Sequence, residues 1–338
     1  MYRLIRPMLF RIDPERVHHL TLNLIGLAGS LPPVYALLRA MFEVNDPRLE
    51  VEAFGIKFKN PIGLAAGYDK GGVAVKGLSS LGFGHIEVGT ITRQPQAGNP
   101  RPRVHRLPEA HAVINSMGFP NDGVAALKVK RGSAKVGINI GKSKDTPIEQ
   151  AAEDYCALFK RVYQQADYVA VNVSSPNTLN LRQLQARDMI EGLLKAVAAV
   201  RDSLTPRVPL LVKIAPDLSE SEIEDVLAAI ASAGLDGIIA TNTTIGREGV
   251  AERYRVLKGG LSGAPLRNRS TEVVRYIARH TAGRLPIVGV GGVAGATDAI
   301  EKLDAGAMLV QVYTGLIYAG PSLVKQINRA LAERKAGV

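Results

Sequence analysis

The most regular pattern along this chain is an alternation between short, continuously apolar runs and longer amphipathic stretches. Leu210-Leu211-Val212 and Ile238-Ile239-Ala240 are typical of the apolar runs. A parallel strand that is buried on both faces has this continuous apolar character, whereas the stretches between the runs are typical of helices. We therefore predict eight parallel strands, at residues 61–65, 85–88, 135–140, 168–173, 209–214, 237–241, 286–290 and 307–312.

Eight strand and helix units in succession predict an α/β protein whose sheet closes into a TIM (β/α)8 barrel. The competing architecture is an open, doubly wound sheet, but its ligand groups would gather at one switch point. Here polar or glycine residues lie at or just beyond the carboxyl ends of all eight predicted strands: Asp69 and Lys70; Thr90; Asn139 and Lys142; Asn172 and Ser175; Lys213; Thr241, Asn242 and Thr243; Gly291 and Gly292; Tyr313 and Thr314. We expect a functional site at these strand ends, covered by the long intervals 90–120 and 243–269.

Residues 1–45 differ from the rest because they combine many large apolar residues with several arginines and few acids. Asp13-Pro14-Glu15 predicts a helix start with an acidic cap, and Pro32-Pro33 opens a second short helix. The first of these helices carries one apolar stripe, formed by Val17, Leu20, Leu24 and Leu27. No run approaches the ~20 apolar residues that span a bilayer. We predict that 1–45 is an amphipathic segment that either lies on a membrane surface or packs as a helical hairpin on the main domain, 46–338.

The chain carries 42 basic and 31 acidic residues, a formal net charge of +11, which favours an acidic partner such as an anionic membrane or a charged metabolite. Nucleic acid is not expected, because no basic run is interleaved with aromatic residues and aromatics make up only 5% of the chain. The single cysteine, Cys156, excludes an intrachain disulfide and fits a reducing compartment, and we expect it to fill the core of a helix. No metal-binding motif is present.

The fourth predicted strand ends in an unusual cluster of amides and hydroxyls, at residues 172–178. Such groups can grip and deprotonate a small polar ring, although a plain turn closed by Pro176 would also account for them. Ser175 is not in a nucleophile elbow, and Pro176 removes the next backbone N–H, so we expect proton abstraction and not acyl transfer.

Two further features indicate an anionic ligand. Lys213 lies within an apolar strand, where its ammonium needs either a ligand anion or an acid from a neighbouring strand. Glycine-rich turns follow the seventh strand at Gly289–Val293 and the eighth at Tyr313-Thr314-Gly315, where such barrels bind phosphate. Tight turns without a ligand are the alternative, and the spacing does not fit a dinucleotide fingerprint.

With these residues assembled, the chain resembles the quinone-dependent (class 2) dihydroorotate dehydrogenases over essentially its whole length. Six segments carry the resemblance: Asn60-Pro61-Ile62-Gly63-Leu64-Ala65-Ala66-Gly67-Tyr68-Asp69-Lys70, Glu87-Val88-Gly89-Thr90, Asn139-Ile140-Gly141-Lys142, Asn172-Val173-Ser174-Ser175-Pro176-Asn177-Thr178, Ala240-Thr241-Asn242-Thr243-Thr244 and Gly289-Val290-Gly291-Gly292. It implies an FMN enzyme of pyrimidine (UMP) biosynthesis that oxidises (S)-dihydroorotate to orotate and passes the electrons to ubiquinone or menaquinone.

The resemblance also assigns site residues, with Ser175 as the catalytic base. FMN would be bound by Ala66, Gly67, Tyr68, Asp69, Lys70, Thr90, Asn139, Asn172, Lys213, Thr241, Gly263, Gly292, Tyr313 and Thr314. Dihydroorotate would be held by Lys70, Asn115, Ser116, Met117, Gly118, Phe119, Asn172, Asn177, Asn242 and Thr243. Because serine is a weak base, it would need a relay through water or a neighbouring hydroxyl such as Thr178. Ser116, Pro120, Leu179 and Asn180 depart from the family pattern, where Arg, Asn, Pro and Gly are commoner.

Quinone-linked members carry an N-terminal helical extension that admits the acceptor, and His18, Arg106 and Tyr313 resemble the residues that line it. The resemblance therefore implies a peripheral protein on the cytoplasmic face of the inner membrane, and we expect a monomer. Two other functions remain open: a dihydroorotate dehydrogenase that uses fumarate or an NAD-linked partner, and a membrane-docked flavoprotein without turnover.

Overall fold

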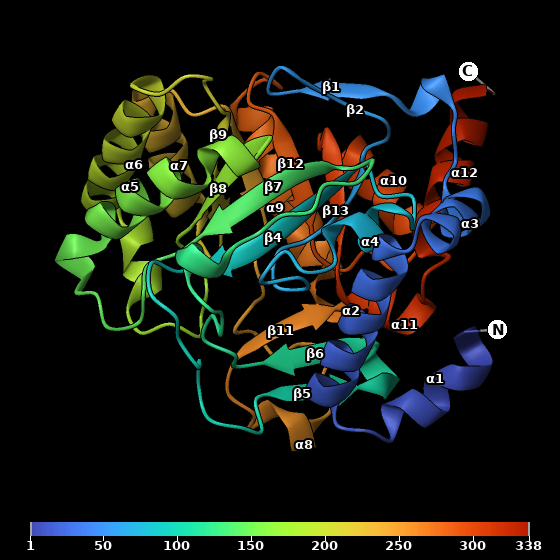
Figure 1. Cartoon of the computed structure of the whole chain (residues 1–338). Coiled ribbons are helices and arrows are strands. Elements are labelled where there is room, and N and C mark those ends of the chain that lie inside the picture. Colours follow the sequence, from blue (N-terminus) through green and yellow to red (C-terminus); the bar gives the residue numbers. More distant parts are fainter. Residues whose placement is uncertain (1, 337–338) are drawn as a thin grey trace.

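The computed structural model describes residues 2–336, and at its centre eight parallel strands form a closed barrel (Figure 1). Its strands are β3 (Ile62–Leu64), β4 (His85–Ile91), β7 (Lys135–Ile140), β8 (Tyr168–Asn172), β9 (Leu210–Ile214), β10 (Gly237–Ala240), β12 (Ile287–Val290) and β13 (Leu309–Val312). They follow one another around the barrel in chain order, so that β13 pairs with β3 and closes it. The prediction of a TIM barrel is confirmed, because each predicted strand forms within a few residues of its expected bounds.

Helices surround the barrel and bury their apolar faces against it. The longer ones are α5 (Ala151–Val162), α6 (Arg187–Asp202), α7 (Glu220–Ala233), α9 (Arg267–His280), α10 (Ala296–Asp304) and α12 (Leu323–Ala336). Shorter helices are α4 (Val75–Ser79), α8 (Glu252–Arg255) and α11 (Thr314–Ala319), with single turns at η1 (Pro47–Leu49), η2 (Pro108–Ala110), η3 (Val124–Ala126), η4 (Ile148–Gln150), η5 (Tyr163–Gln165), η6 (Leu181–Gln185) and η7 (Ala264–Leu266). Cys156 is half-buried on α5 against the core, and this burial raises the pKa of its thiol, as expected of a packing residue.

Two small antiparallel sheets lie at opposite ends of the barrel in Figure 1. The hairpin of β1 (Val51–Ala53) and β2 (Ile56–Phe58) packs Phe58 against the amino-terminal end of the strands. At the carboxyl-terminal end, β5 (Val104–Leu107), β6 (Ala112–Asn115) and β11 (Gly260–Gly263) form one sheet in the order β11-β6-β5. The two long intervals that the sequence indicated therefore join into a single covering sheet, here called the cover sheet.

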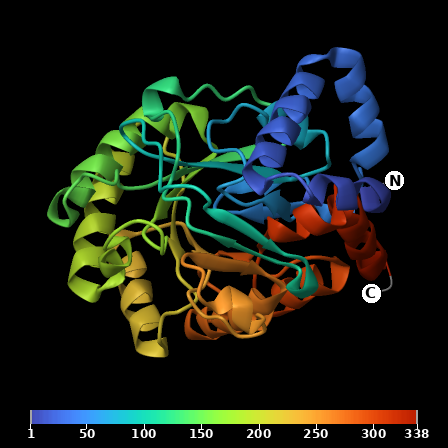
Figure 2. The same ribbon diagram turned by 90° about the horizontal axis from the view of Figure 1, so that it is seen from below.

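The N-terminal segment forms three helices: α1 (Tyr2–Phe10), α2 (Pro14–Ser30) and α3 (Pro32–Phe42). In Figure 2 they project beside the C-terminal helices at one side of the barrel. The sequence predicted α2 and α3 but not α1. The predicted cap of α2 is present, because Asp13 Oδ1 accepts hydrogen bonds from the backbone N–H groups of Glu15 (3.1 Å) and Arg16 (2.9 Å).

One face of α2 packs on α4 so closely that the backbones of the two helices are almost in contact. A Cβ added at Gly29 would lie 2.4 Å from the nitrogen of Gly77, and one added at Gly77 would lie 1.9 Å from the carbonyl oxygen of Ile25. Glu15, at the start of the helix, is buried and accepts a 2.6 Å hydrogen bond from Arg103 Nη2 in the segment before β5. The N-terminal segment therefore packs on the main domain, which was one of the two alternatives predicted for it.

The opposite face of the extension exposes its large apolar side chains, with Leu20, Leu24 and Leu27 each more than half exposed. Leu4 and Met8 on α1 and Leu37 on α3 are also exposed by more than half. Within residues 2–336, no single helix has the length and apolar character to cross a membrane; α2 and α3 meet that standard only as a pair, bent by 107°.

Candidate active site

A cavity of about 1140 Å³, counting its open mouth, lies between the carboxyl ends of the barrel strands and the cover sheet. Most of the residues predicted from the sequence line it: Ala66, Gly67, Lys70, Thr90, Asn115, Met117, Gly118, Phe119, Asn172, Ser175, Asn177, Lys213, Thr241, Asn242, Thr243, Gly263, Gly292, Tyr313 and Thr314. The chain brings these residues together from across the barrel, as the polar strand ends indicated.

Four of the residues predicted to bind FMN or dihydroorotate do not line the cavity, and the roles assigned to all of the site residues stay predictions. The carboxylate of Asp69 accepts hydrogen bonds from the backbone N–H groups of Val73 (3.0 Å) and Ala74 (2.8 Å), so it holds the turn before α4. The other three are Tyr68, Asn139 and Ser116, of which Asn139 lies directly behind the cavity wall.

Three polar side chains at neighbouring strand ends form one buried network. Thr90 Oγ1 donates to Asn139 Oδ1 (2.6 Å), and Asn172 Nδ2 donates to both Thr90 Oγ1 (3.0 Å) and Asn139 Oδ1 (3.1 Å). The three side chains come from β4, β7 and β8, which are adjacent in the barrel. The role of Asn139 in this structure is therefore to fix the orientation of Thr90 and Asn172.

The amide of Asn242 extends this network around the rim. Its Nδ2 donates to Ser174 Oγ (3.0 Å) and Asn172 Oδ1 (3.3 Å), while its Oδ1 accepts from the backbone N–H of Thr243 (2.7 Å). On the other side, Asn177 Nδ2 donates to Asn115 Oδ1 (3.1 Å) on the cover sheet. The four cavity asparagines are thus held in two pairs. The Nδ2 of Asn115 and the Oδ1 of Asn177 are left for a ligand, whereas Asn172 and Asn242 would have to exchange bonds with their neighbours for bonds to a ligand.

Ser175 is buried between these two pairs of asparagines and lines the cavity. Its Oγ accepts a 3.2 Å hydrogen bond from the backbone N–H of Asn177. The nearby hydroxyl of Thr178 is buried and has no hydrogen-bond partner among the described residues. The structure therefore provides a free buried hydroxyl close in sequence to the serine but no direct bond between the two.

The loop that carries Ser175 also explains how one departure from the family pattern is tolerated. Asn180 adopts φ 58° and ψ 1°, a left-handed conformation in which asparagine is strained less than most residues. Leu179, the residue before Asn180, is 77% exposed, and its side chain therefore does not pack in the core. The loop can therefore form without the commoner Pro-Gly pair.

Lys213 has the acidic partner that one sequence interpretation required. Its Nζ lies 3.8 Å from Glu87 Oε1, and both side chains are buried. The acid comes from β4 across the barrel interior and not from an adjacent strand. Glu87 also accepts hydrogen bonds from Asn139 Nδ2 (2.8 Å) and Gln311 Nε2 (2.7 Å). The ammonium of Lys213 lines the cavity at the same time, so it can still meet a ligand anion.

A second cavity lysine, Lys70, lies where β3 leads into α4. Loss of hydration lowers its pKa to about 8, with opposing effects from Glu15 and Arg103. A bound carboxylate beside Lys70 would favour the charged form and raise this pKa again. Lys70 therefore has the properties of an anion-binding group.

The glycine-rich turns after β12 and β13 meet at one side of the cavity. Gly292 has φ 73°, and a Cβ there would lie 2.4 Å from the Cα of Arg267, so only glycine fits. Thr314 Oγ1 lies 2.8 Å from Ser262 Oγ of β11, which ties this corner to the cover sheet. Exposed backbone N–H groups in such a corner can bind a phosphate.

Sequence reasoning missed several lining residues, among them His111, Ser262, Gln311 and Tyr318. Gln311 had a signal, because it is a polar residue inside the apolar strand β13, as Lys213 is in β9. Its Oε1 is buried at the cavity and has no partner among the described residues. Ser262 lies in β11 of the cover sheet and His111 in the turn just before β6, and the strands of this sheet were not predicted.

The three residues predicted for an acceptor channel lie where the N-terminal helices meet the barrel. His18 of α2 packs edge to face on Tyr68 (5.0 Å between ring centroids), and Tyr68 packs in the same way on Tyr313 (5.7 Å). Burial and the nearby charge of Lys70 lower the pKa of His18 to about 3, so its ring is neutral. Arg106 donates to the carbonyl of Leu9 (3.2 Å) and holds the connection between α1 and α2. No group of metal-ligating side chains is found in residues 2–336.

Comparison with known proteins gives a consistent result. The family model described as "Dihydroorotate dehydrogenase" matches residues 48–334. Curated relatives named dihydroorotate dehydrogenase (quinone) from Stutzerimonas stutzeri and Christiangramia forsetii are 51% and 48% identical to the chain, and each alignment covers 98–99% of both sequences. A crystal structure of dihydroorotate dehydrogenase from Eimeria tenella in complex with ferulenol superposes with a TM-score of 0.88 at 35% identity, covering 98% of this chain and 96% of the other.

Proposed function

Because this chain belongs to the dihydroorotate dehydrogenase family, we propose that it oxidises (S)-dihydroorotate to orotate in the cavity under the cover sheet, with FMN as the flavin and a quinone as the electron acceptor. The observation that carries the proposal is the convergence of Ser175, four asparagines and two lysines on one cavity. The relatives' names give the reaction and the class of acceptor, and the cavity supplies residues suited to each step.

The cavity fits a flavin mononucleotide at both ends. At the barrel axis, the orphaned Oε1 of Gln311 and the ammonium of Lys213 offer an acceptor and a positive charge to a polar ring. At the rim, Gly292 and Thr314 form the glycine-rich corner suited to a phosphate. A flavin held by these residues would supply the acceptor for the hydride that leaves C6 of the substrate.

The asparagines recognise the substrate ring in this proposal. A cyclic amide has alternating donors and acceptors, and each carboxamide offers one of each. Asn172 and Asn242 hold one edge of the ring, and Asn115 and Asn177 hold the other. Lys70 binds the carboxylate, which is consistent with its lowered pKa in the free protein.

Ser175 then removes the proton from C5 of dihydroorotate. Its Oγ already accepts the N–H of Asn177, a bond that orients the lone pairs and stabilises charge that develops on the oxygen. The proton must move on, because serine is a weak base, and Thr178 is the candidate relay since its buried hydroxyl has no hydrogen-bond partner within residues 2–336. The ammonium of Lys213 would offset negative charge that develops in the cavity during the reaction. The ion pair with Glu87 holds the lysine side chain in place.

The N-terminal helices supply the route for the quinone and the contact with the membrane. The exposed face with Leu20, Leu24 and Leu27 suits the apolar part of a bilayer surface, and the net charge of +11 favours anionic lipids. His18 and Tyr313 lie at the inner end of this segment, next to the cavity. We therefore propose a peripheral protein of the cytoplasmic side of the membrane, which acts as a monomer.

Anaerobic spectroscopy tests the proposal directly. The purified yellow protein is expected to bleach when dihydroorotate is added and to regain its absorbance when a quinone analogue follows. Bleaching that is reversed by fumarate but not by quinone would identify a soluble acceptor instead. A bound flavin that dihydroorotate does not bleach would overturn the proposal.

A further inference from the structure

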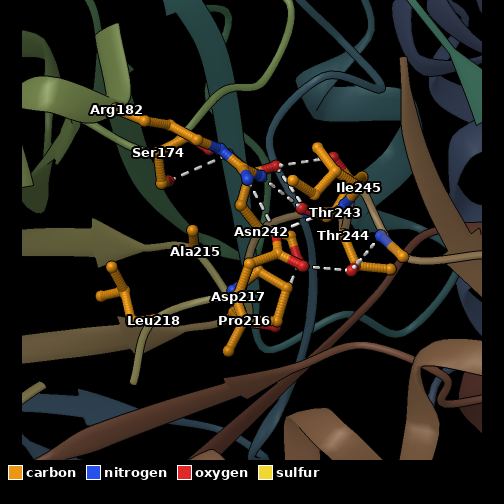
Figure 3. Close-up of polar contacts among 12 residues, drawn as sticks. Ser174, Arg182, Ala215, Pro216, Asp217, Leu218, Asn242, Thr243, Thr244 and Ile245 are labelled. Carbon is orange, nitrogen blue, oxygen red and sulfur yellow. Dashed lines mark hydrogen bonds and ion pairs between the residues drawn. The ribbon is translucent and has the colours of Figure 1, made fainter. Parts of the chain in front are cut away.

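One arginine connects the loop of Ser175 to the loop of Asn242 and Thr243 (Figure 3). Arg182 Nε donates to the carbonyl oxygen of Ser174 (3.0 Å), and its Nη2 donates to the carbonyl oxygen of Thr243 (2.9 Å). The third arm of the guanidinium, Nη1, donates to Asp217 Oδ2 at 2.7 Å. The three guanidinium nitrogens of Arg182 therefore each bind a different loop.

Asp217 follows β9 and completes the connection. Besides Arg182, its carboxylate accepts hydrogen bonds from the hydroxyl of Thr244 and from the backbone N–H of Ile245 (3.3 Å). The loops after β8, β9 and β10 are thus joined around one ion pair, as the dashed lines in Figure 3 show. Both side chains of the pair are about three-quarters shielded from solvent.

The backbone beneath Arg182 is also fixed. Gln185, in the same turn η6, is buried and accepts a hydrogen bond from the backbone N–H of Ala215 (3.0 Å), while its Nε2 donates to the carbonyl of Arg182 (3.4 Å). The guanidinium therefore extends from an anchored base. Its planar fork can donate in three directions at once, which a lysine ammonium on a flexible stem does not reproduce.

We propose that Arg182, oriented by Asp217, is a positioning residue that holds Ser175 at its working distance from the substrate amides. The carbonyl that Arg182 grips belongs to the residue immediately before Ser175, and the other carbonyl belongs to Thr243, beside Asn242. The proposal rests on the proposed function, since it takes Ser175 as the base. A displacement of about 1 Å at such a base can reduce a rate about 100-fold.

Arg269 provides a matched control from the same neighbourhood. Its guanidinium also binds two backbone carbonyls, those of Pro216 (2.9 Å) and Leu218 (2.7 Å), which flank Asp217. It has no hydrogen bond to the serine loop among the described residues. Removing either arginine would thus loosen the β9 loop, whereas only the removal of Arg182 would release the loop that carries Ser175.

The kinetic test measures single-turnover bleaching of the FMN-loaded enzyme by dihydroorotate. We expect Arg182→Ala to retain its flavin and to bleach about 10- to 100-fold more slowly, and Arg269→Ala to stay within about twofold of the wild type. Added guanidinium ion should restore part of the rate in Arg182→Ala. Arg182→Lys should be intermediate, because one ammonium cannot hold both carbonyls.

Hydrogen exchange gives a readout that does not depend on turnover. In the FMN-loaded protein, Arg182→Ala should exchange faster at residues 173–179 and 240–245, and Arg269→Ala should not change 173–179. Asp217→Asn should also speed hydrogen exchange in both segments. This variant is used in place of Arg182→Ala if Arg182→Ala folds poorly.

The outcomes separate the inference from the function on which it rests. Normal bleaching by the wild type, with Arg182→Ala also within twofold of it, would overturn the positioning role alone. Equal slowing in the Arg182 and Arg269 variants would overturn it as well. A wild type that does not bleach at all would overturn the proposed function and the inference together.

Discussion

The buried pair of Lys213 and Glu87 permits a quantitative prediction. Glu87→Gln keeps the shape of the side chain and the hydrogen bond from Asn139 Nδ2 but removes the charge opposite Lys213. Gln311 now donates to Glu87, and it can turn its amide so that its unpartnered Oε1 accepts from the new amide group. Breaking a buried ion pair from one side costs about 3–5 kcal/mol, because the remaining charge is left uncompensated. The separation of 3.8 Å without a direct hydrogen bond places this pair at the lower end, at about 3 kcal/mol.

Thermal unfolding, followed by circular dichroism at pH 7, measures this cost. A loss of about 3 kcal/mol corresponds to a fall of about 4 °C in Tm for a chain of this size. Lys213→Met and the double variant complete a cycle, and the double variant should lose about 2 kcal/mol less than the two single losses added together. Asp225→Asn is the control, because it breaks an exposed pair with Arg187 at a similar distance (3.6 Å) and should cost no more than about 0.5 kcal/mol.

Two results would refute the reasoning. One is a Glu87→Gln variant that unfolds at the wild-type temperature, which would mean that the ion pair of Glu87 with Lys213 does not stabilise the folded protein. The other is strict additivity in the cycle, which would mean that each side chain contributes through different neighbours.

The remaining predictions concern the reaction and the membrane. Ser175→Ala should bind FMN normally but reduce it about 100- to 10,000-fold more slowly in stopped flow, whereas unchanged reduction would exclude a base role. The KM for dihydroorotate should be constant below about pH 8 and rise above it, because Lys70 loses its proton there and with it the attraction for a carboxylate; Lys70→Met should flatten this part of the profile. Replacing Leu20, Leu24 and Leu27 together by serine should weaken sedimentation with anionic vesicles while leaving flavin reduction by dihydroorotate intact, and a variant that still sediments fully would place the contact elsewhere.

The barrel could be predicted from the sequence because its strands are buried on both faces and therefore mostly apolar, as in 210–212 and 237–240. The cover sheet could not be, because β6 pairs with β11, about 150 residues away, and strands so short have no periodicity of their own. Helix α1 was missed for a related reason: it has nine residues, with Pro7 inside, and it is supported by residues distant in sequence, as in the bond from Tyr2 to the carbonyl of Ile317 (2.5 Å).

The same division holds in the site. Residues that follow barrel strands, such as Thr90 and Asn172, were predicted because the closed barrel alone brings strand ends together. Arg182 and Asp217 were not, because an arginine in a loop is usually solvated, and nothing local indicates that its guanidinium meets three separate loops. Sequence patterns therefore give the position of the cavity, whereas the contacts that orient its groups require the three-dimensional structure.

The fit of α2 on α4 bears on how this enzyme can be engineered. With Gly29 and Gly77 almost in contact, and Glu15 joined to Arg103, the helix that exposes the outer leucines also forms part of the wall of the main domain. Trimming the first forty residues to obtain a more soluble protein would uncover buried surface and leave Arg103 without its counter-ion. Polar substitutions on the outer leucines alone are the safer route to a detergent-free preparation.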